Sequence, residues 1–147
     1  MYTTAQSRQG FTLVEILVVV LIITILATVV GIRVANQPGE ARIAAAKAQL
    51  VVFRTALNLY RMNHGQVPAA AQGLEALCRC PTRPPVPQGY PEEGYIESRT
   101  VPKDPWGRPY VYLVPGPEGL PYDLLTYGAD GEPGGTGENA DLGLSAM

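Results

Sequence analysis

The residues of this chain that could do chemistry are few, and one of them stands where a charge is costly. Glu15 lies in "RQGFTLVEILVVVLIITILATVVGI" (residues 8–32), in which Arg8 and Glu15 are the charged residues of an otherwise apolar stretch. A charged side chain in a helix that enters hydrocarbon costs roughly 2.5 to 3.5 kcal/mol near the bilayer centre, and less toward the interface. Glu15 therefore requires a partner or a function.

Three interpretations of this N-terminal segment are open from the residues alone. A cleaved secretory signal has an apolar region of about 7 to 15 residues, whereas residues 11–32 are long enough to cross a bilayer core of about 30 Å. A plain membrane anchor, with Arg8 on the cytoplasmic side, fits that length but leaves Glu15 unexplained. A cut between Gly10 and Phe11 would create an amine that pairs with Glu15 of a neighbouring copy and sets the register between subunits.

A second set of candidate residues lies in the C-terminal segment "YGADGEPGGTGENAD" (127–141). Its hard oxygen donors are the carboxylates of Asp130, Glu132, Glu138 and Asp141. The glycines between them let backbone carbonyls turn inward, as the six to eight oxygen ligands of calcium require. Asp130 and Asp141 have the first-to-last separation of an EF-hand loop, but no flanking helices are predicted, so we reject that motif. Composition alone predicts a solvated acidic loop.

Catalysis finds little support in the sequence. There is no Gly-x-Ser-x-Gly, Walker or His-Glu-x-x-His motif, so we predict that the chain is not an enzyme. The single histidine, His64, stands beside a predicted helix end and is expected to be solvated. The formal net charge is −2 and no Lys/Arg-rich run is present, which argues against nucleic acid as a partner.

One long helix must position these residues. Apolar side chains recur at spacings of three and four residues at Ile43, Ala46, Leu50, Phe53, Leu57 and Tyr60, which predicts a stripe that packs against the C-terminal domain. Charged residues seven apart mark another face at Glu40, Lys47, Arg54 and Arg61. We predict a helix from Phe11 to about Asn63, ended by Gly65, with a kink or local opening within residues 34–39 at Pro38 and Gly39.

The second half of the chain predicts a small antiparallel sheet, which makes the fold α+β. A short helix is expected over residues 72–77, and the best strands are residues 110–114 and 122–126, separated by a Pro/Gly turn. Asp104 and Pro105, followed by Trp106 and Gly107, predict a turn with Trp106 packed on the sheet.

The quoted segments resemble one family of filament proteins. "GFTLVEILVVVLIITILA" resembles the class III leader junction of type IV pilins and type II secretion pseudopilins, in which a short hydrophilic leader ends at Gly10. "NHGQVPAAAQGLEAL", "GYI", "VPKDPWGRPYVY" and "TYGADGEPGGTGENAD" follow, in order, the pattern of the major pseudopilins of type II secretion, the general secretion pathway protein G family. The similarity extends from Gly10 to Asp141, so a type IV pilin-like fold is expected.

The resemblance implies how the N-terminus is used. In this family a prepilin peptidase cuts after the glycine at the position of Gly10 and methylates the new amine, here that of Phe11. Glu15 then recruits or registers the next subunit. The chain would accordingly consist of a cleaved leader (1–10), a membrane-inserted and filament-core helix (11–37) and a periplasmic domain (38–147).

In the C-terminal loop the resemblance implies a bound calcium ion. Asp130 and Asp141 would supply carboxylates and Tyr127 its backbone carbonyl. Cys78 and Cys80 depart from the family pattern. In the oxidising periplasm they could form a disulfide, although a ring closed over one residue is strained. Two free thiols and bridges to neighbouring copies are the alternatives, because one histidine and two cysteines do not make a zinc site.

The implied function is that of the major structural subunit of a type II secretion pseudopilus. The subunit would insert into the bacterial inner membrane as a single-pass protein, contact lipid before assembly, and polymerise into a periplasmic helical filament that helps drive folded proteins through the outer membrane. Its partners would be other copies of itself, minor pseudopilins, the inner-membrane assembly platform, the prepilin peptidase and the secretin. The alternatives are a type IV pilin for adhesion or motility and a membrane-anchored enzyme.

Overall fold

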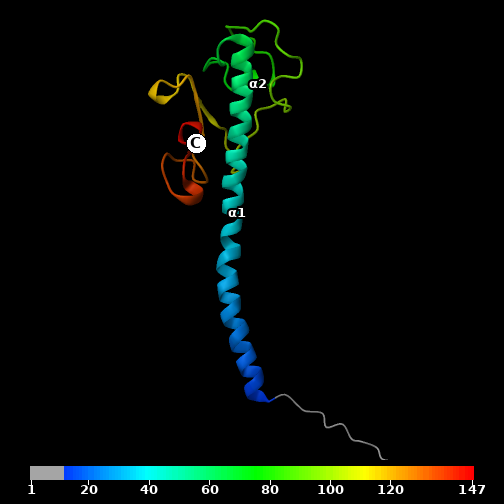
Figure 1. Ribbon diagram of the computed structural model, residues 1–147, viewed down its shortest axis with the longest axis vertical. Coiled ribbons are helices and arrows are strands. Elements are labelled where there is room, and N and C mark those ends of the chain that lie inside the picture. The colour runs from blue at the N-terminus through cyan, green and yellow to red at the C-terminus, as the bar shows by residue number, and fades with distance from the viewer. Residues whose placement is uncertain (1–11) are drawn as a thin grey trace, which may run out of the picture. The chain divides into compact units, whose positions relative to one another are not determined.

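The computed structural model describes residues 12–147, apart from the side chains of residues 28–38. It divides the chain into two compact units, Met1–Pro38 and Gly39–Met147. Helix α1 (Leu13–His64) contributes residues to both units, and every other element belongs to the second one (Figure 1). Within residues 12–147, no helical segment with described side chains combines the length and hydropathy that a membrane crossing requires.

Helix α1 ends where the sequence predicts. Gly65 adopts a φ of 79° and its N–H donates to the carbonyl of Arg61 at 2.8 Å, which is the left-handed residue that commonly follows a helix. The helix assignment runs through residues 34–39 without a break, so the local opening predicted at Pro38 and Gly39 is not found. A kink at the same place stays a prediction.

The core of the second unit is built on the predicted stripe of α1. Leu50 and Leu57 are fully buried and Phe53 is 1% exposed, while Ile43 at the end of the stripe is half-buried. Phe53 contacts the ring of Tyr110 edge-on, with 5.2 Å between the ring centroids. Each large apolar side chain buried in this way contributes roughly 1.5 to 3 kcal/mol. The prediction that the stripe packs against the C-terminal domain is therefore confirmed.

Helix α2 (Glu75–Cys78) is shorter than the predicted helix over residues 72–77. The reason is a turn just before it, in which Gly73 has a φ of 63° that a helix does not allow. Gln72 fixes this turn, because its side chain accepts from the N–H of Ala69 at 2.9 Å and donates to the carbonyls of Arg83 and Pro85 at 2.8 Å each. The turn also explains why the buried Gln72 has all its polar atoms satisfied.

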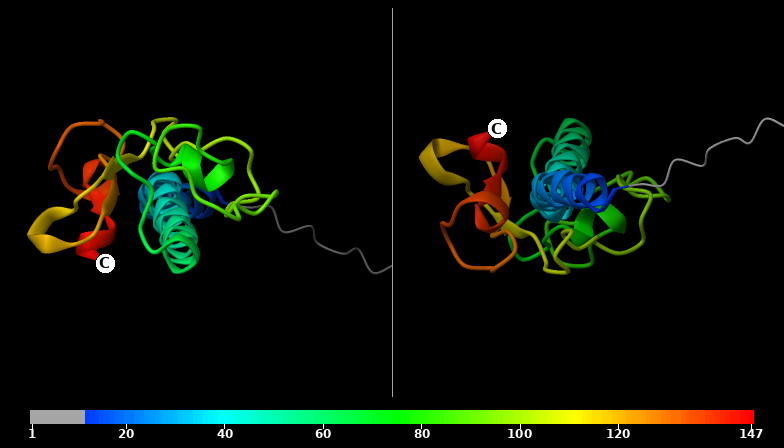
Figure 2. Two further views of the ribbon diagram at one scale, coloured as in Figure 1. Left: turned by 90° about the horizontal axis from the view of Figure 1, so that it is seen from above. Right: turned by 90° about the horizontal axis from the view of Figure 1, so that it is seen from below.

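Three short antiparallel strands form the sheet in the order β1 (Val111–Leu113), β2 (Asp123–Thr126) and β3 (Leu142–Gly143). Tyr112 pairs with Leu124, and Leu125 pairs with Gly143. The first two strands lie within the predicted ranges. β3 has two residues, too few for an alternating pattern, and sequence reasoning does not locate it. The sheet and the segment 65–100 lie on different sides of the second half of α1 (Figures 1 and 2).

Candidate functional site

Glu15 lies in the first turn of α1, next to the residue that caps the helix. Its backbone N–H donates to the side-chain hydroxyl of Thr12 at 3.2 Å, and the N–H of Ile16 donates to the carbonyl of Thr12 at 3.2 Å. Thr12 is thus the N-cap, and Thr12 and Glu15 have the spacing of a capping box. Sequence reasoning misses this cap, although Thr-x-x-Glu before an apolar run is a usable signal for it.

The side chain of Glu15 is exposed, and so are its apolar neighbours. Every large apolar residue from Leu13 to Leu26 has at least the 45% exposure of Val18. Gly10 and Phe11, where the leader is predicted to end, lie outside the described residues, as do the side chains of residues 28–32 in the predicted membrane span. The pairing of Glu15 with an amine at Phe11 therefore stays a prediction.

The C-terminal loop, residues 127–141, joins β2 to β3 and holds its two predicted carboxylate ligands by its own backbone. Asp130 accepts the N–H of Glu132 at 3.1 Å, and Asp141 accepts the N–H of Gly134 at 2.9 Å. Both carboxylates are exposed and, among the described residues, neither forms an ion pair. No group of three or more His, Cys, Asp or Glu side chains suited to a metal gathers in the described part of the chain.

The third predicted ligand, the carbonyl of Tyr127, lies at the start of this loop. It accepts the N–H of Gly131 at 3.2 Å, which closes a tight turn around Asp130. Gly128 adopts a φ of 64°, and a Cβ built there would lie 2.6 Å from the carbonyl oxygen of Glu138. The two sides of the loop are therefore packed backbone to backbone, which only glycine allows at this position.

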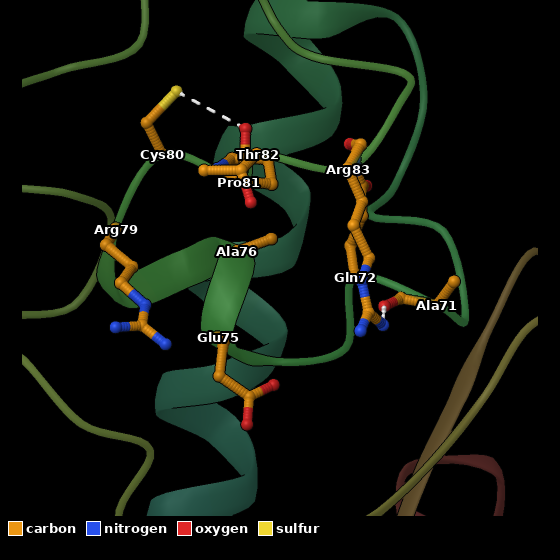
Figure 3. A pocket seen from close by; sticks show the side chains of 9 residues that line it. All are labelled: Ala71, Gln72, Glu75, Ala76, Arg79, Cys80, Pro81, Thr82 and Arg83. Carbon is orange, nitrogen blue, oxygen red and sulfur yellow. Dashed lines mark hydrogen bonds between the residues drawn. The ribbon is translucent and has the colours of Figure 1, made fainter.

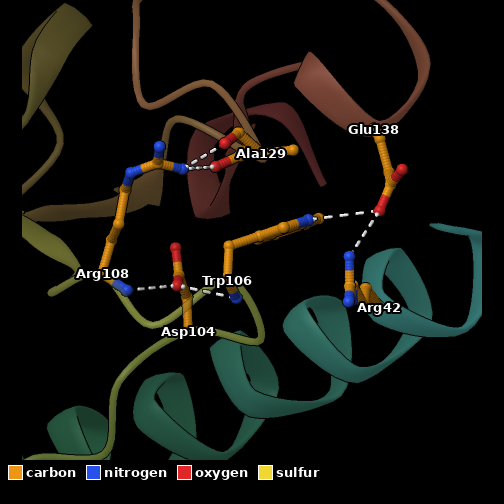
Figure 4. Close-up of polar contacts among 7 residues, drawn as sticks. Arg42, Asp104, Trp106, Arg108, Ala129 and Glu138 are labelled. Carbon is orange, nitrogen blue, oxygen red and sulfur yellow. Dashed lines mark hydrogen bonds and ion pairs between the residues drawn. The ribbon is translucent and has the colours of Figure 1, made fainter. Parts of the chain in front are cut away.

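A buried carboxylate, that of Asp104, organises the turn that faces this loop. Asp104 is 4% exposed and accepts the backbone N–H groups of Trp106 at 3.1 Å and Arg108 at 2.7 Å, and also the hydroxyl of Thr126 on β2. The guanidinium of Arg108 donates to the carbonyls of Gly128 and Ala129 (Figure 4). It also donates to the carbonyl of Asp130, at 2.9 Å. The turn at 104–107 is predicted from the sequence, whereas the reach of Arg108 into the loop is not.

Glu138, a half-buried acid of the loop, connects it to α1. Its Oε1 accepts the indole N–H of Trp106 at 3.3 Å and lies 3.4 Å from the guanidinium of Arg42 (Figure 4). Gly39 lies beside it, and a Cβ there would be 2.8 Å from the carboxylate carbon. The indole N–H of Trp106 is thus directed to the loop, and the predicted packing of Trp106 on the sheet stays unconfirmed. One carboxylate oxygen of Glu138 is thus engaged by Trp106 and Arg42.

The two cysteines are free thiols with different surroundings. Cys78 is buried at the end of α2, where burial and then Glu75 raise the pKa of its thiol while Arg79 opposes them. Cys80 is exposed and lines a pocket of about 530 Å³ with Arg79 and Arg83 (Figure 3). The structure thus contains the free-thiol alternative, and a disulfide under oxidising conditions stays a prediction.

His64 is not the solvated residue that the sequence predicts. It is half-buried among tyrosines, with its ring centroid 4.6 Å from that of Tyr60. The hydroxyl of Tyr95 lies 2.7 Å from Nε2 of His64 and accepts the side-chain N–H of Asn63 at 3.1 Å. Burial raises the pKa of the neighbouring Tyr90 hydroxyl above its ordinary value. These rings close the end of the core.

Comparison with known proteins gives a match to both parts of the sequence. The family described as "Type II secretion system (T2SS), protein G" matches residues 33–145. The family described as "Prokaryotic N-terminal methylation motif" matches residues 6–31. Together these two matches cover the predicted leader junction, all of α1 except Ile32, and the whole sheet with its C-terminal loop.

Individual relatives agree with these matches. The type II secretion system core protein G of Pseudomonas aeruginosa is 43% identical over 94% of this chain and 95% of its own length, and that of Vibrio cholerae is 43% identical over 94% and 92%. The crystal structure of the major pseudopilin from the type 2 secretion system of enterohaemorrhagic Escherichia coli is 33% identical, with a TM-score of 0.63, over 77% of this chain and 94% of that one. This chain belongs to the type II secretion system protein G family.

Proposed function

We propose that this chain is the major structural subunit of a type II secretion pseudopilus and has no reaction of its own. The observation that carries the proposal is the family match over residues 33–145, in a chain whose first helical segment leaves its large apolar side chains uncovered. Exposed apolar surface of this extent marks a binding surface. A lipid bilayer before assembly, and other copies of the helix after it, would cover this surface.

The methylation motif over residues 6–31 supports processing at the N-terminus. In the proposal a prepilin peptidase removes residues 1–10 and the amine of Phe11 is methylated. The amine then pairs with Glu15 of a neighbouring subunit, which compensates the cost of the carboxylate in an apolar surrounding. Among residues 12–147, Thr12 accepts the backbone N–H of Glu15 and no hydrogen bond involves the Glu15 carboxylate, which supports its pairing with this partner.

The proposal places the C-terminal domain in the periplasm and the first half of α1 in the inner membrane until assembly. The filament would grow from an inner-membrane platform, carry minor pseudopilins and push folded proteins through the secretin. A type IV pilin for adhesion or motility is the alternative, and the names of the relatives do not favour it.

Calcium is proposed as the ion of the C-terminal loop, and the oxygen donors of the loop are of the chemical type that calcium binds. Asp130 and Asp141 are exposed carboxylates of one loop that no cationic side chain neutralises among the described residues. Carboxylate and carbonyl oxygens are the ligands that calcium prefers. Asp130, Asp141 and the carbonyl of Tyr127 would hold the ion. Glu138 is not included in the proposed donor set, and its Oε1 contacts Trp106 and Arg42.

In this role calcium would supply structural stabilisation. Its charge offsets the repulsion between the two carboxylates, and a ligand that binds only the folded loop stabilises it by mass action. The chain itself orients the ligands, because the backbone N–H groups of Glu132 and Gly134 donate to the carboxylates of Asp130 and Asp141.

The function is tested by complementation. The gene for the full chain is expressed in a strain that lacks its own core protein G, and a secreted enzyme is assayed in the culture medium. Restored secretion, together with filaments sheared from cells that overproduce the chain, is the expected result. Restored twitching or surface adhesion in a pilin-deficient strain, without restored secretion, would favour the type IV pilin alternative.

A further inference from the structure

The C-terminal loop already contains a cation supplied by the chain itself. The guanidinium of Arg108 donates to three consecutive backbone carbonyls, at 2.8 Å to Gly128, to Ala129, and at 2.9 Å to Asp130. We propose that Arg108 is a positioning residue that holds residues 128–131 in place without metal, so that the loop presents Asp130 in a fixed position. Three acceptors on one planar group match the fork of donors that arginine offers.

The backbone of Arg108 is itself held in place by Asp104. The backbone N–H of Arg108 donates to the side-chain carboxylate of Asp104, and the backbone carbonyl of Arg108 accepts the backbone N–H of Asp104 at 2.8 Å. The turn is therefore closed from both ends. Asp104 also accepts the hydroxyl of Thr126, the last residue of β2. The loop segment that Arg108 binds begins two residues after Thr126. The strand, the turn and the loop are therefore joined by one buried carboxylate and one guanidinium.

Gly131 gives a second and independent sign of this contact. Its φ is 75°, and a Cβ built there would lie 2.6 Å from Nε and 2.8 Å from Cζ of Arg108. The loop backbone thus rests directly on the guanidinium, with no room for a side chain between them. Gly137, in the same loop, has a φ of 63° but nothing within 4 Å of its built Cβ.

Arg108 and the proposed calcium ion would use different oxygens. Arg108 binds the carbonyls of residues 128–130, whereas the proposed ligands are the carboxylates of Asp130 and Asp141 and the carbonyl of Tyr127. The guanidinium therefore leaves all three ligands available. Presentation of Asp130 to calcium rests on the proposed function, but the ordering of the loop by Arg108 does not.

Hydrogen exchange in the full chain, held in detergent micelles with EGTA, tests the ordering directly. The amides to follow are those of Ala129, bonded to the carbonyl of Glu138, and Gly131, bonded to that of Tyr127. We expect Arg108→Gln to accelerate their exchange by roughly tenfold or more, since charge-assisted hydrogen bonds to three acceptors are lost. The exchange rates in Arg108→Lys should fall between those of the wild type and those of Arg108→Gln. Arg99→Gln, at an exposed arginine, is the control and should change nothing. Unchanged exchange in Arg108→Gln would overturn the inference.

A glycine pair provides a test that does not depend on removing charge. Gly131→Ala and Gly137→Ala introduce the same strain of positive φ, but only the first displaces Arg108. We expect Gly131→Ala to accelerate exchange of Ala129 more than Gly137→Ala does, and this difference to disappear in an Arg108→Gln background. A difference that persists without Arg108 would contradict the proposal.

Adding calcium separates this inference from the proposed metal site. If calcium slows exchange in the Arg108→Gln loop, the ion and the arginine support the same segment. If calcium changes neither the wild type nor the variant, the metal site is wrong, and the comparison made in EGTA still decides the role of Arg108.

Discussion

The two halves of α1 share one helical backbone and differ in what covers their side chains. Within residues 12–27 the large apolar residues are uncovered on every side, from 45% exposure at Val18 to 81% at Leu13. After Gly39 one apolar stripe is covered, and Leu50 and Leu57 on it are fully buried by the sheet and the segment around α2, whereas Val52 and Met62 outside the stripe are exposed. The comparison teaches that a stripe is satisfied within the chain, whereas a helix that is apolar all round needs another molecule.

The largest effect should come from the one charge in the uncovered half. Glu15→Ala is expected to permit membrane insertion and cleavage but to abolish assembly, because the amine of the next subunit loses its partner. Pelleted filaments and secreted enzyme measure the result, and Glu40→Ala, an exposed acid of the second half, is the matched control. Normal filament yield from Glu15→Ala would refute the registering role.

Thr12→Ala separates this role from capping. The cap is a bond to the backbone N–H of Glu15, which the alanine variant of Glu15 keeps. Loss of the cap costs about 1 kcal/mol. We therefore expect Thr12→Ala to weaken the first turn of the helix while assembly continues.

Removal of the leader is expected to decide whether the first half of α1 can assemble into a filament. Gly10→Val should block the peptidase, so that the protein keeps its ten-residue leader and no amine forms at Phe11. Intact-mass measurement of the purified full chain shows this directly, with the wild type as reference. A cut beyond Ala27 would instead indicate an ordinary signal peptide.

A pair of leucines tests the comparison within α1 itself. Leu57→Ala creates a cavity in the core and should lower the free energy of unfolding by about 2 to 5 kcal/mol. Leu21→Ala, at a residue that is 56% exposed, should leave the stability of the second unit unchanged and reduce filament yield. Thermal unfolding of the full chain in detergent, followed by the fluorescence of Trp106, measures the first effect. Equal losses in both variants would show that the two halves do not differ as described.

Sequence reasoning recovers the features that follow from local patterns. The stripe from Ala46 to Tyr60 and the helix end at Gly65 depend on spacing and on a single glycine, and the structure contains both. β3 is missed because two residues carry no period. The reach of Arg108 is missed because its acceptors lie about twenty residues away and meet it only through the sheet register.

The calcium site is the next effect in size. Calcium should raise the melting temperature of the full chain in detergent by several degrees, since saturation at about 100 times the dissociation constant stabilises by about 2.7 kcal/mol. Asp130→Ala should abolish the rise, while Glu118→Ala, at an exposed acid in the β1–β2 connection, should keep it. Melting that is unchanged by saturating calcium and by chelator would leave the loop as a surface turn.

The smallest effect concerns the ion pair that joins the covered half of α1 to the loop. Arg42 and Glu138 lie 3.4 Å apart, but their side chains are 52% and 38% exposed, so solvent and salt screen the pair. Arg42→Met should lower the free energy of unfolding by less than about 1 kcal/mol, and the loss should shrink as salt is added. Trp106→Phe removes the other donor to Glu138, keeps an aromatic ring, and should cost about 0.5 to 1.5 kcal/mol at any salt concentration. A loss in Arg42→Met that exceeds the loss in Trp106→Phe, or that does not respond to salt, would mean that the charge and not the indole holds the loop against α1.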